Sequence, residues 1–182
     1  MKGMIFTEFM GMVENRWSLD MVDTIIARSG VPSGGAYTAV GTYPHEELVA
    51  LVMSLSQESG IQVPDLIRAY GQHLFGRFAD LYPRFFEDIK GCFHFLSGIE
   101  DIIHAEVRKL YPDADLPTFK VSQAPGRMEL AYFSTHPFAD LAQGLIEGCL
   151  AHFGEDITLT REPGTELGGA QARFTLVARG QA

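Results

Sequence analysis

The spacing of the apolar residues changes after Pro117, and this change restricts the chain to a fold that combines helices with a sheet. Before Pro117, apolar side chains recur every three or four positions, as in Ile5, Phe9 and Met12, which is typical of an amphipathic helix. After it, polar and apolar residues alternate in several short segments, as they do in strands. We therefore expect an α+β fold, with a helical N-terminal subdomain and a C-terminal subdomain that holds a small antiparallel sheet and packed helices.

Capping residues, glycines and prolines indicate where the expected helices and strands begin and end. Ser18 is a good N-cap for a helix that ends near Gly30. Further helices are expected from Pro44 to about Ser59, over 64–80, over about twenty residues up to Tyr111, where Pro112 stops it, and over 138–153. Strands are expected at Met128–Ser134 and in a hairpin formed by 157–162 and 172–178 around the turn-rich segment 163–169. We interpret 1–182 as one domain with a helical lobe over about 1–62 and an α/β lobe over about 63–182.

Composition excludes several function classes. The 182 residues include 14 Lys and Arg against 23 Asp and Glu, a net charge of −9, which argues against binding to nucleic acid or to an anionic membrane. Glu8 and Glu14 interrupt the apolar start, so it does not resemble a signal peptide, and no apolar run is long enough to span a bilayer. The two cysteines, Cys92 and Cys149, are expected to be reduced, buried thiols in a cytoplasmic protein.

One histidine stands out from the other five. His104 lies within a helical segment beside an apolar stripe that includes Ile99, Ile103 and Val107, with Glu100 one turn before it. A single neutral imidazole on an apolar helix is how one proximal histidine holds a heme iron. The same pattern also fits a hydrogen-bonded core histidine, so this feature alone leaves both interpretations open.

A second polar feature lies on the predicted strand near residue 132. Tyr132, Ser134 and His136 occupy alternate positions and therefore share one face of the strand. Their hydroxyl and imidazole donors suit a carboxylate or phosphate, although a solvent-facing polar row gives the same pattern. The sequence contains none of the common nucleophile, P-loop or metalloprotease motifs, and we find no His–Arg pair of the kind that peroxidases place next to their heme. His73, on the predicted helix over 64–80, is the one histidine near the expected distal side. We therefore do not expect an enzyme.

Together these features resemble the heme–nitric oxide/oxygen binding (H-NOX) family over nearly the whole chain. The start MKGMIF is similar to the family's opening. The segment IIHAEVRKLYP followed by DLP is similar to its proximal histidine region, and MELAYFSTH is similar to the strand that carries its Tyr-x-Ser-x-Arg motif. The order and the spacing of these segments agree with the family, as does the total length.

The resemblance implies a cofactor, heme b (iron protoporphyrin IX), held between the two subdomains. It implies that His104 ligates the iron and that Tyr132 and Ser134 bind the heme propionates, with His136 at the position of the family's arginine. The residues implied to pack against the porphyrin are Met1, Ile5, Pro117 and Leu145, with Pro117 distorting it. The residues implied on the distal side are Phe9, Leu74, Phe78 and Leu141.

Two positions carry the functional expectations. His136 replaces an arginine, so the propionate contact is expected to be looser or dependent on pH, unless a nearby residue such as Arg127 substitutes. Leu141 stands where oxygen-binding members carry a distal tyrosine. We therefore expect a sensor that binds NO and CO and discriminates against O2. Because the sequence ends at Ala182 without an output domain, we expect it to act in trans on a histidine kinase or a cyclic-di-GMP enzyme.

A different class of function remains open from the sequence. An aromatic-rich core with 13 Phe also fits a non-heme module that holds an apolar ligand or a partner protein. The discriminating observation is the absorption spectrum of the purified chain, because only a bound heme gives a Soret band.

Overall fold

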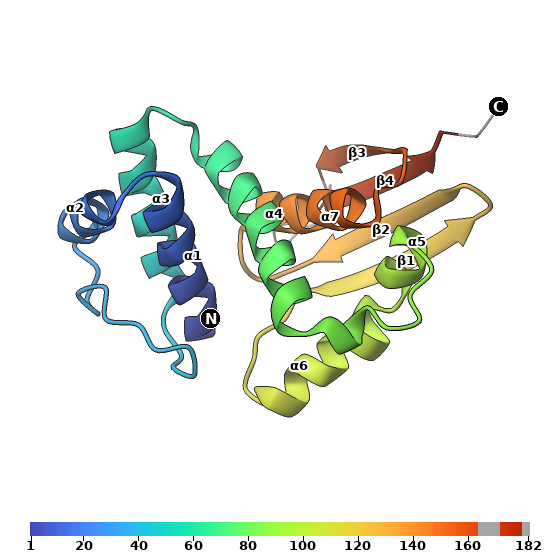
Figure 1. Ribbon diagram of the computed structural model, residues 1–182, viewed down its shortest axis with the longest axis horizontal. Coiled ribbons are helices and arrows are strands. Elements are labelled where there is room, and N and C mark those ends of the chain that lie inside the picture. Colours follow the sequence, from blue (N-terminus) through green and yellow to red (C-terminus); the bar gives the residue numbers. More distant parts are fainter. Residues whose placement is uncertain (164–171, 180–182) are drawn as a thin grey trace.

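A computed structural model describes residues 1–163 and 172–179, and Figure 1 shows the N-terminal helices on one side and, on the other, a sheet with further helices packed beside it. The first three helices are α1 (Gly3–Arg16), α2 (Leu19–Ser29) and α3 (His45–Ser59). The predicted cap of α2 is confirmed, because the Ser18 hydroxyl accepts a hydrogen bond from the Met21 N–H at 3.1 Å. Gly30 ends that helix with a φ of 62°, a conformation that favours glycine. Pro44 is the N-cap of α3, one position outside the helix.

Helix α4 (Val63–Leu81) joins the two sides of the molecule (Figure 1). Its first half packs into an apolar cluster with α1, α2 and α3, in which Phe6, Phe9, Leu51 and Tyr70 are almost fully buried. A second apolar cluster is centred on the sheet and on α7 (Ala139–Phe153), which lies next to α4. The chain therefore has two apolar cores, and α4 contributes to both, through Leu66 and Leu74 to the first and Phe75 to the second.

The sheet is antiparallel throughout, with strand order β1-β2-β4-β3. Its strands are β1 (Thr118–Ala124), β2 (Arg127–Phe133), β3 (Ile157–Pro163) and β4 (Ala172–Ala178). The predicted pairing of the last two strands is confirmed, while the connection 164–171 lies outside the described residues. The sequence analysis did not anticipate β1. Only Phe119 of that strand is partly buried, so an edge strand of this kind shows little alternation in burial.

The predicted helix of about twenty residues before Pro112 is interrupted. It consists of α5 (Cys92–Ser97), a π-helical segment (Ile99–His104) and α6 (Ala105–Leu110). The break occurs at Gly98, whose carbonyl accepts hydrogen bonds from the N–H groups of both Ile102 and Ile103, at 2.9 and 3.2 Å. The extra residue in that turn shifts the helical phase just before His104. Such π-segments are frequent at functional sites.

Between α5 and the preceding helix lies a connection that contains a short 3-10 turn (Pro83–Phe85).

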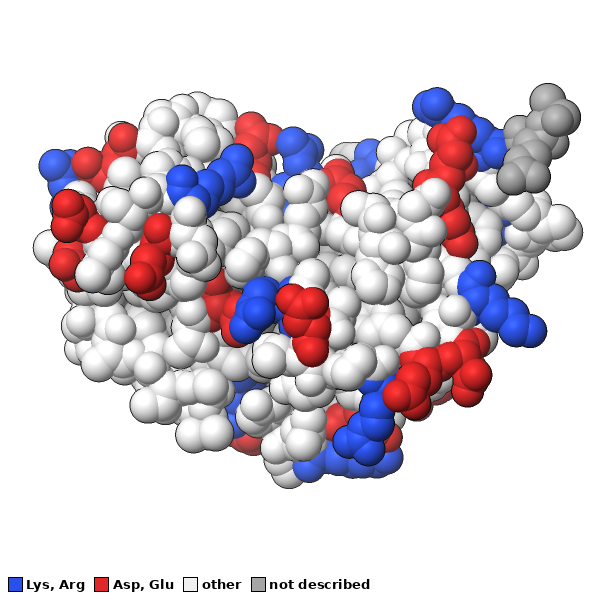
Figure 2. Space-filling view, in the orientation of Figure 1, with Lys and Arg blue, Asp and Glu red and all other residues white. Residues whose placement is uncertain are grey.

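No helix within the described residues is long and apolar enough to cross a membrane. On the face shown in Figure 2, Lys and Arg side chains are interspersed with Asp and Glu rather than gathered into one region.

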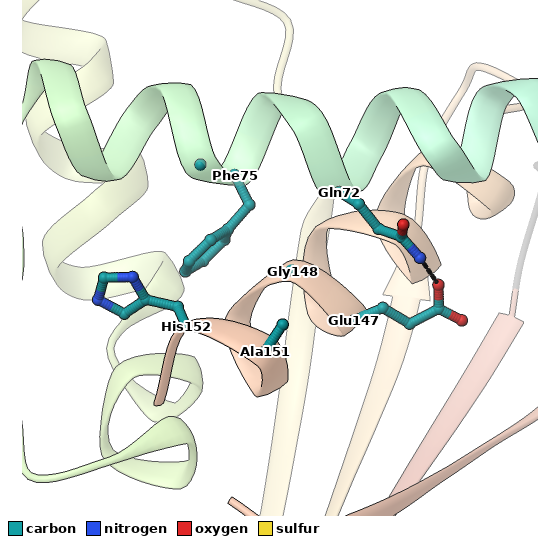
Figure 3. A pocket seen from close by; sticks show the side chains of 7 residues that line it. Gln72, Phe75, Glu147, Gly148, Ala151 and His152 are labelled. Atoms are coloured by element: carbon teal, nitrogen blue, oxygen red, sulfur yellow. Dashed lines mark hydrogen bonds between the residues drawn. The ribbon is translucent and has the colours of Figure 1, made fainter. Parts of the chain in front are cut away.

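Helices α4 and α7 approach closely because glycines line their contact. A Cβ atom placed on Gly71 would lie 2.5 Å from the Leu141 carbonyl oxygen, and one placed on Gly144 would overlap the Arg68 carbonyl oxygen. Figure 3 shows the next turn, where Gly148 lies beneath Phe75, whose Cβ is 2.7 Å from the position of an added Cβ. Beside them, the Gln72 side-chain amide donates to the Glu147 carboxylate at 2.6 Å.

We predict that Gly144→Ala destabilises the protein by about 1–3 kcal/mol, because the added methyl group forces α4 and α7 apart. The matched control is Gly76→Ala on α4, where no atom lies within 4 Å of an added Cβ. That substitution should stabilise the helix by about 0.5–1 kcal/mol. Urea denaturation of both variants measures the difference, and equal midpoints would contradict the importance of the close contact.

Candidate functional site

A cavity of about 270 Å³ lies between the first turn of α1, helices α4 and α7, the π-helical segment with α6, and the end of β2. Most of the side chains that line it are aliphatic or aromatic. Those predicted from the sequence to contact a cofactor and found in its wall are Met1, Ile5, Leu74, Phe78, Pro117, Leu141 and Leu145. A cavity with an apolar wall and few polar groups is typical of a site for an apolar ligand or cofactor.

Phe9 is the one predicted wall residue that does not line the cavity. It is fully buried in the N-terminal core, where its ring meets Tyr70 edge-on at 5.3 Å between centroids. The cavity contacts only the first turn of α1 and Met1 before it, and Phe9 lies one turn beyond Ile5. The Tyr70 hydroxyl donates to the Ile5 carbonyl at 2.5 Å, which fixes that first turn next to α4.

In the apolar part of the wall, His104 is the main side chain with a nitrogen atom that can bind a ligand. The side chain is 11% exposed, and its Nδ1 lies 3.1 Å from Glu100 Oε1. The same carboxylate oxygen accepts the Phe119 backbone N–H at 2.7 Å, so Glu100 connects the helical segment to β1. Because a carboxylate accepts hydrogen bonds, Nδ1 carries the proton and Nε2 keeps its lone pair for a ligand.

The charge state of His104 follows from its surroundings. Burial lowers its pKa, while the Glu100 carboxylate raises it and Arg108 lowers it. Burial has the largest effect, so the neutral imidazole is favoured near neutral pH. A neutral imidazole whose other nitrogen is held by a carboxylate is the usual form of a metal-bound histidine.

The polar rim of the cavity consists of Tyr132, Ser134 and His136, all of which line it. Only Tyr132 belongs to β2, which ends at Phe133, so the predicted strand row is in fact one strand residue followed by a loop. The Ser134 hydroxyl oxygen accepts the His136 backbone N–H at 3.0 Å. Burial raises the pKa of Tyr132, which keeps its phenol protonated as a donor.

The wall also contains aromatic residues that the sequence analysis did not single out. They come from the end of α4, the 3-10 turn and α5, and comprise Tyr82, Phe85, Phe86 and Phe95. Phe86 stacks on Phe95 at 4.9 Å with an angle of 14° between the rings. The run YPRFF at 82–86 was the available signal, since so many aromatic residues in a connection indicate that the connection is packed against something.

Three side chains noted in the sequence, those of His73, Cys92 and Cys149, lie apart from the cavity. His73, noted in the sequence, does not line it and lies 3.9 Å from Glu8, which pairs with Arg77 at 2.7 Å. Cys92 and Cys149 are free and fully buried, as predicted, with their sulfur atoms 3.4 Å apart. Within the described ranges there is no group of three or more His, Cys, Asp or Glu side chains that could hold a metal ion.

Comparison with protein-family models identifies one family. The Haem-NO-binding (HNOB) model matches residues 2–161, most of the chain. No curated protein matches the chain significantly.

Solved structures agree with the family match. An H-NOX protein from K. algicida in the unliganded Fe(II) state is 35% identical, with a TM-score of 0.91, covering 100% of this chain and 98% of that one. The IWP-051-bound H-NOX from Shewanella woodyi in the Fe(II)CO state is 37% identical, with a TM-score of 0.84 and coverages of 100% and 96%. An H-NOX protein from S. oneidensis in the Fe(II)NO state is 25% identical, with a TM-score of 0.89 and coverages of 99% and 100%.

The geometry around Glu100 gives a prediction for the ligand-free chain. Glu100→Gln removes the charge that raises the pKa of His104 while keeping a group that accepts from Nδ1, so that pKa should fall further. When the pKa of a histidine is lowered on folding, the protein becomes less stable as the pH falls below the pKa of that histidine in the unfolded chain. The variant should lose more stability than the wild type over this range. An NMR titration of the His104 ring measures the shift. Glu106→Gln on α6, an exposed carboxylate paired with Lys109, is the control and should leave the titration unaltered.

Proposed function

The chain belongs to the Haem-NO-binding (H-NOX) family of heme-binding sensor domains, and on that premise we propose that it is a receptor for nitric oxide in which His104 holds the iron of heme b. One observation carries this proposal. The buried His104 lines an apolar cavity, with Nδ1 fixed by Glu100 and Nε2 left for a metal. When bound there, the heme supplies the ferrous iron at which NO or CO binds.

The other residues of the cavity fit the remainder of such a cofactor. An apolar wall that includes Ile5, Pro117 and Leu145 suits a porphyrin ring, and we propose that Pro117 distorts the ring. The hydroxyl groups of Tyr132 and Ser134, on the polar rim, suit its two carboxylates. The chain has no C-x-x-C motif for covalent attachment of a heme, which favours heme b.

Selectivity rests on the side chains placed across the cavity from His104 in the family pattern. Leu74, Phe78 and Leu141 line the cavity and offer no hydrogen-bond donor to a diatomic ligand. Binding of O2 depends on such a donor more than binding of NO or CO does. We therefore propose that the protein binds NO and CO and discriminates against O2.

Signalling requires that His104 and the two lobes respond to the ligand together. We propose that release of the His104 side chain allows the π-helical segment to relax and α1 to shift at Met1 and Ile5. Such a shift transmits a signal only if the ligand binds one arrangement better than the other. The family resemblance implies a cytoplasmic histidine kinase or cyclic-di-GMP enzyme as the receiver, and a sensor without catalysis of its own.

The first test is the absorption spectrum of the chain and of His104→Gly. We predict a Soret band in the wild type that shifts with CO and with NO, and a loss of heme affinity of more than about 100-fold in the variant, because the iron loses its protein ligand. His94→Gln, an exposed histidine on α5, is the control and should bind heme normally. A folded wild-type chain that remains colourless with hemin and reductant would instead favour the non-heme module for an apolar ligand.

The second test concerns Leu141. Leu141→Tyr places a phenol donor in the cavity wall, and we predict that the reduced variant acquires a spectrum in air distinct from that under argon, while the wild type does not. Leu141→Phe adds a ring without the hydroxyl and is the matched control. A wild-type protein with a stable oxygenated spectrum in air would refute the proposed selectivity.

A further inference from the structure

Two imidazoles from different lobes meet at the polar rim. His136 follows β2, and His45 is the first residue of α3 in the helical lobe. Their ring centroids are 4.1 Å apart, with an angle of 41° between the rings. Both rings also contact Phe138, at 5.9 Å for His45 and 6.3 Å for His136. The His45 side chain is 22% exposed, and the rings of His136 and Phe138 lie against it.

His136 is restrained from three directions. Its Nε2 lies 2.9 Å from Asp115 Oδ2, its backbone N–H is bonded to Ser134, and one ring face is covered by His45. The Asp115 side chain is 61% exposed and that of His136 is 24% exposed, so this end of the cavity opens toward solvent. With Nε2 bonded to Asp115, Nδ1 is the nitrogen left for a ligand in the cavity.

We propose that His45 and Asp115 are positioning residues that hold the His136 imidazole toward a carboxylate of the bound ligand, and that the contact between His45 and His136 connects that carboxylate to the helical lobe. This inference rests on the proposed function, since the heme propionates are the carboxylates in question. His136 makes the carboxylate contact. His45 acts through it, because His45 does not line the cavity.

The arrangement makes carboxylate binding depend on the protons of the His136 ring. His136 donates from Nδ1 to a carboxylate while bonded to Asp115 at Nε2 only when both ring nitrogens carry protons. The charged groups that contact the pair are Asp115 beside His136 and Glu46, whose Oε2 is 3.2 Å from His45 Nδ1.

The positioning is tested first on the chain before heme is added. The 15N shifts of the His136 ring report which nitrogen carries the proton. We expect Asp115→Asn and His45→Ala each to change these shifts, because each removes a contact of the His136 ring. Asp113→Asn is the matched control, since that carboxylate is in the same loop, is 63% exposed and pairs with Lys2 instead. Unaltered His136 shifts in both test variants would overturn the inference whether or not heme binds.

The second test measures transfer of heme from the loaded protein to excess apomyoglobin. His136→Arg, whose charge is permanent, should lose heme more slowly than the wild type. His45→Ala should lose heme about tenfold faster than the wild type, because the His136 ring loses a contact that orients it toward the carboxylate. His45→Phe should restore the wild-type rate, because a phenyl ring retains the ring–ring contact. Identical transfer rates for the wild type and His45→Ala would refute the role of His45. Absence of a Soret band in the wild type would refute the proposed function itself.

Discussion

The contact between His104 and Glu100 connects the parts of this molecule that matter for its site. One carboxylate oxygen holds Nδ1 of a buried imidazole and also accepts a backbone N–H from Phe119 in β1. The Glu100 side chain is 27% exposed, and the two hydrogen bonds that its Oε1 accepts replace part of its contact with water. The contacts of Glu100 hold the π-helical segment next to β1 and set the orientation of the His104 ring, and therefore of its Nε2. Without these contacts, His104 would be an ordinary core histidine with no defined direction.

The features that the sequence predicted well are those with local causes. The cap at Ser18, the end of α2 at Gly30 and the alternation in β2 each depend on residues within a few positions of one another. The family resemblance added the wall of the cavity, which no local pattern contains. The features that the sequence did not indicate depend on distant contacts. The π-segment after Gly98 is stabilised by β1, and Phe9 has the same helical spacing as Ile5 but meets Tyr70 rather than the cavity.

In the proposed role of His136, its neighbours compensate for the absence of an arginine. An arginine would provide a permanent charge without assistance. The imidazole is shorter and needs a fixed orientation, and Asp115 and His45 provide contacts that restrain it. Because one of these contacts comes from the helical lobe, a change in the relation between the lobes would alter the polar rim as well as the apolar wall.

The polar contacts between the two lobes are partly solvated. Lys2 pairs with Asp113, whose side chain is 63% exposed, and Arg77 pairs with Glu8, so both pairs contribute little to stability. Within the lobes, cores such as Phe6 with Leu51 and Leu130 with Phe174 are almost fully buried. Shifting one lobe against the other disturbs these polar contacts, the cavity wall and the apolar packing of the N-terminal helices on α4, while unfolding either lobe would expose its core. A ligand in the cavity touches both lobes, so its binding energy acts at their interface.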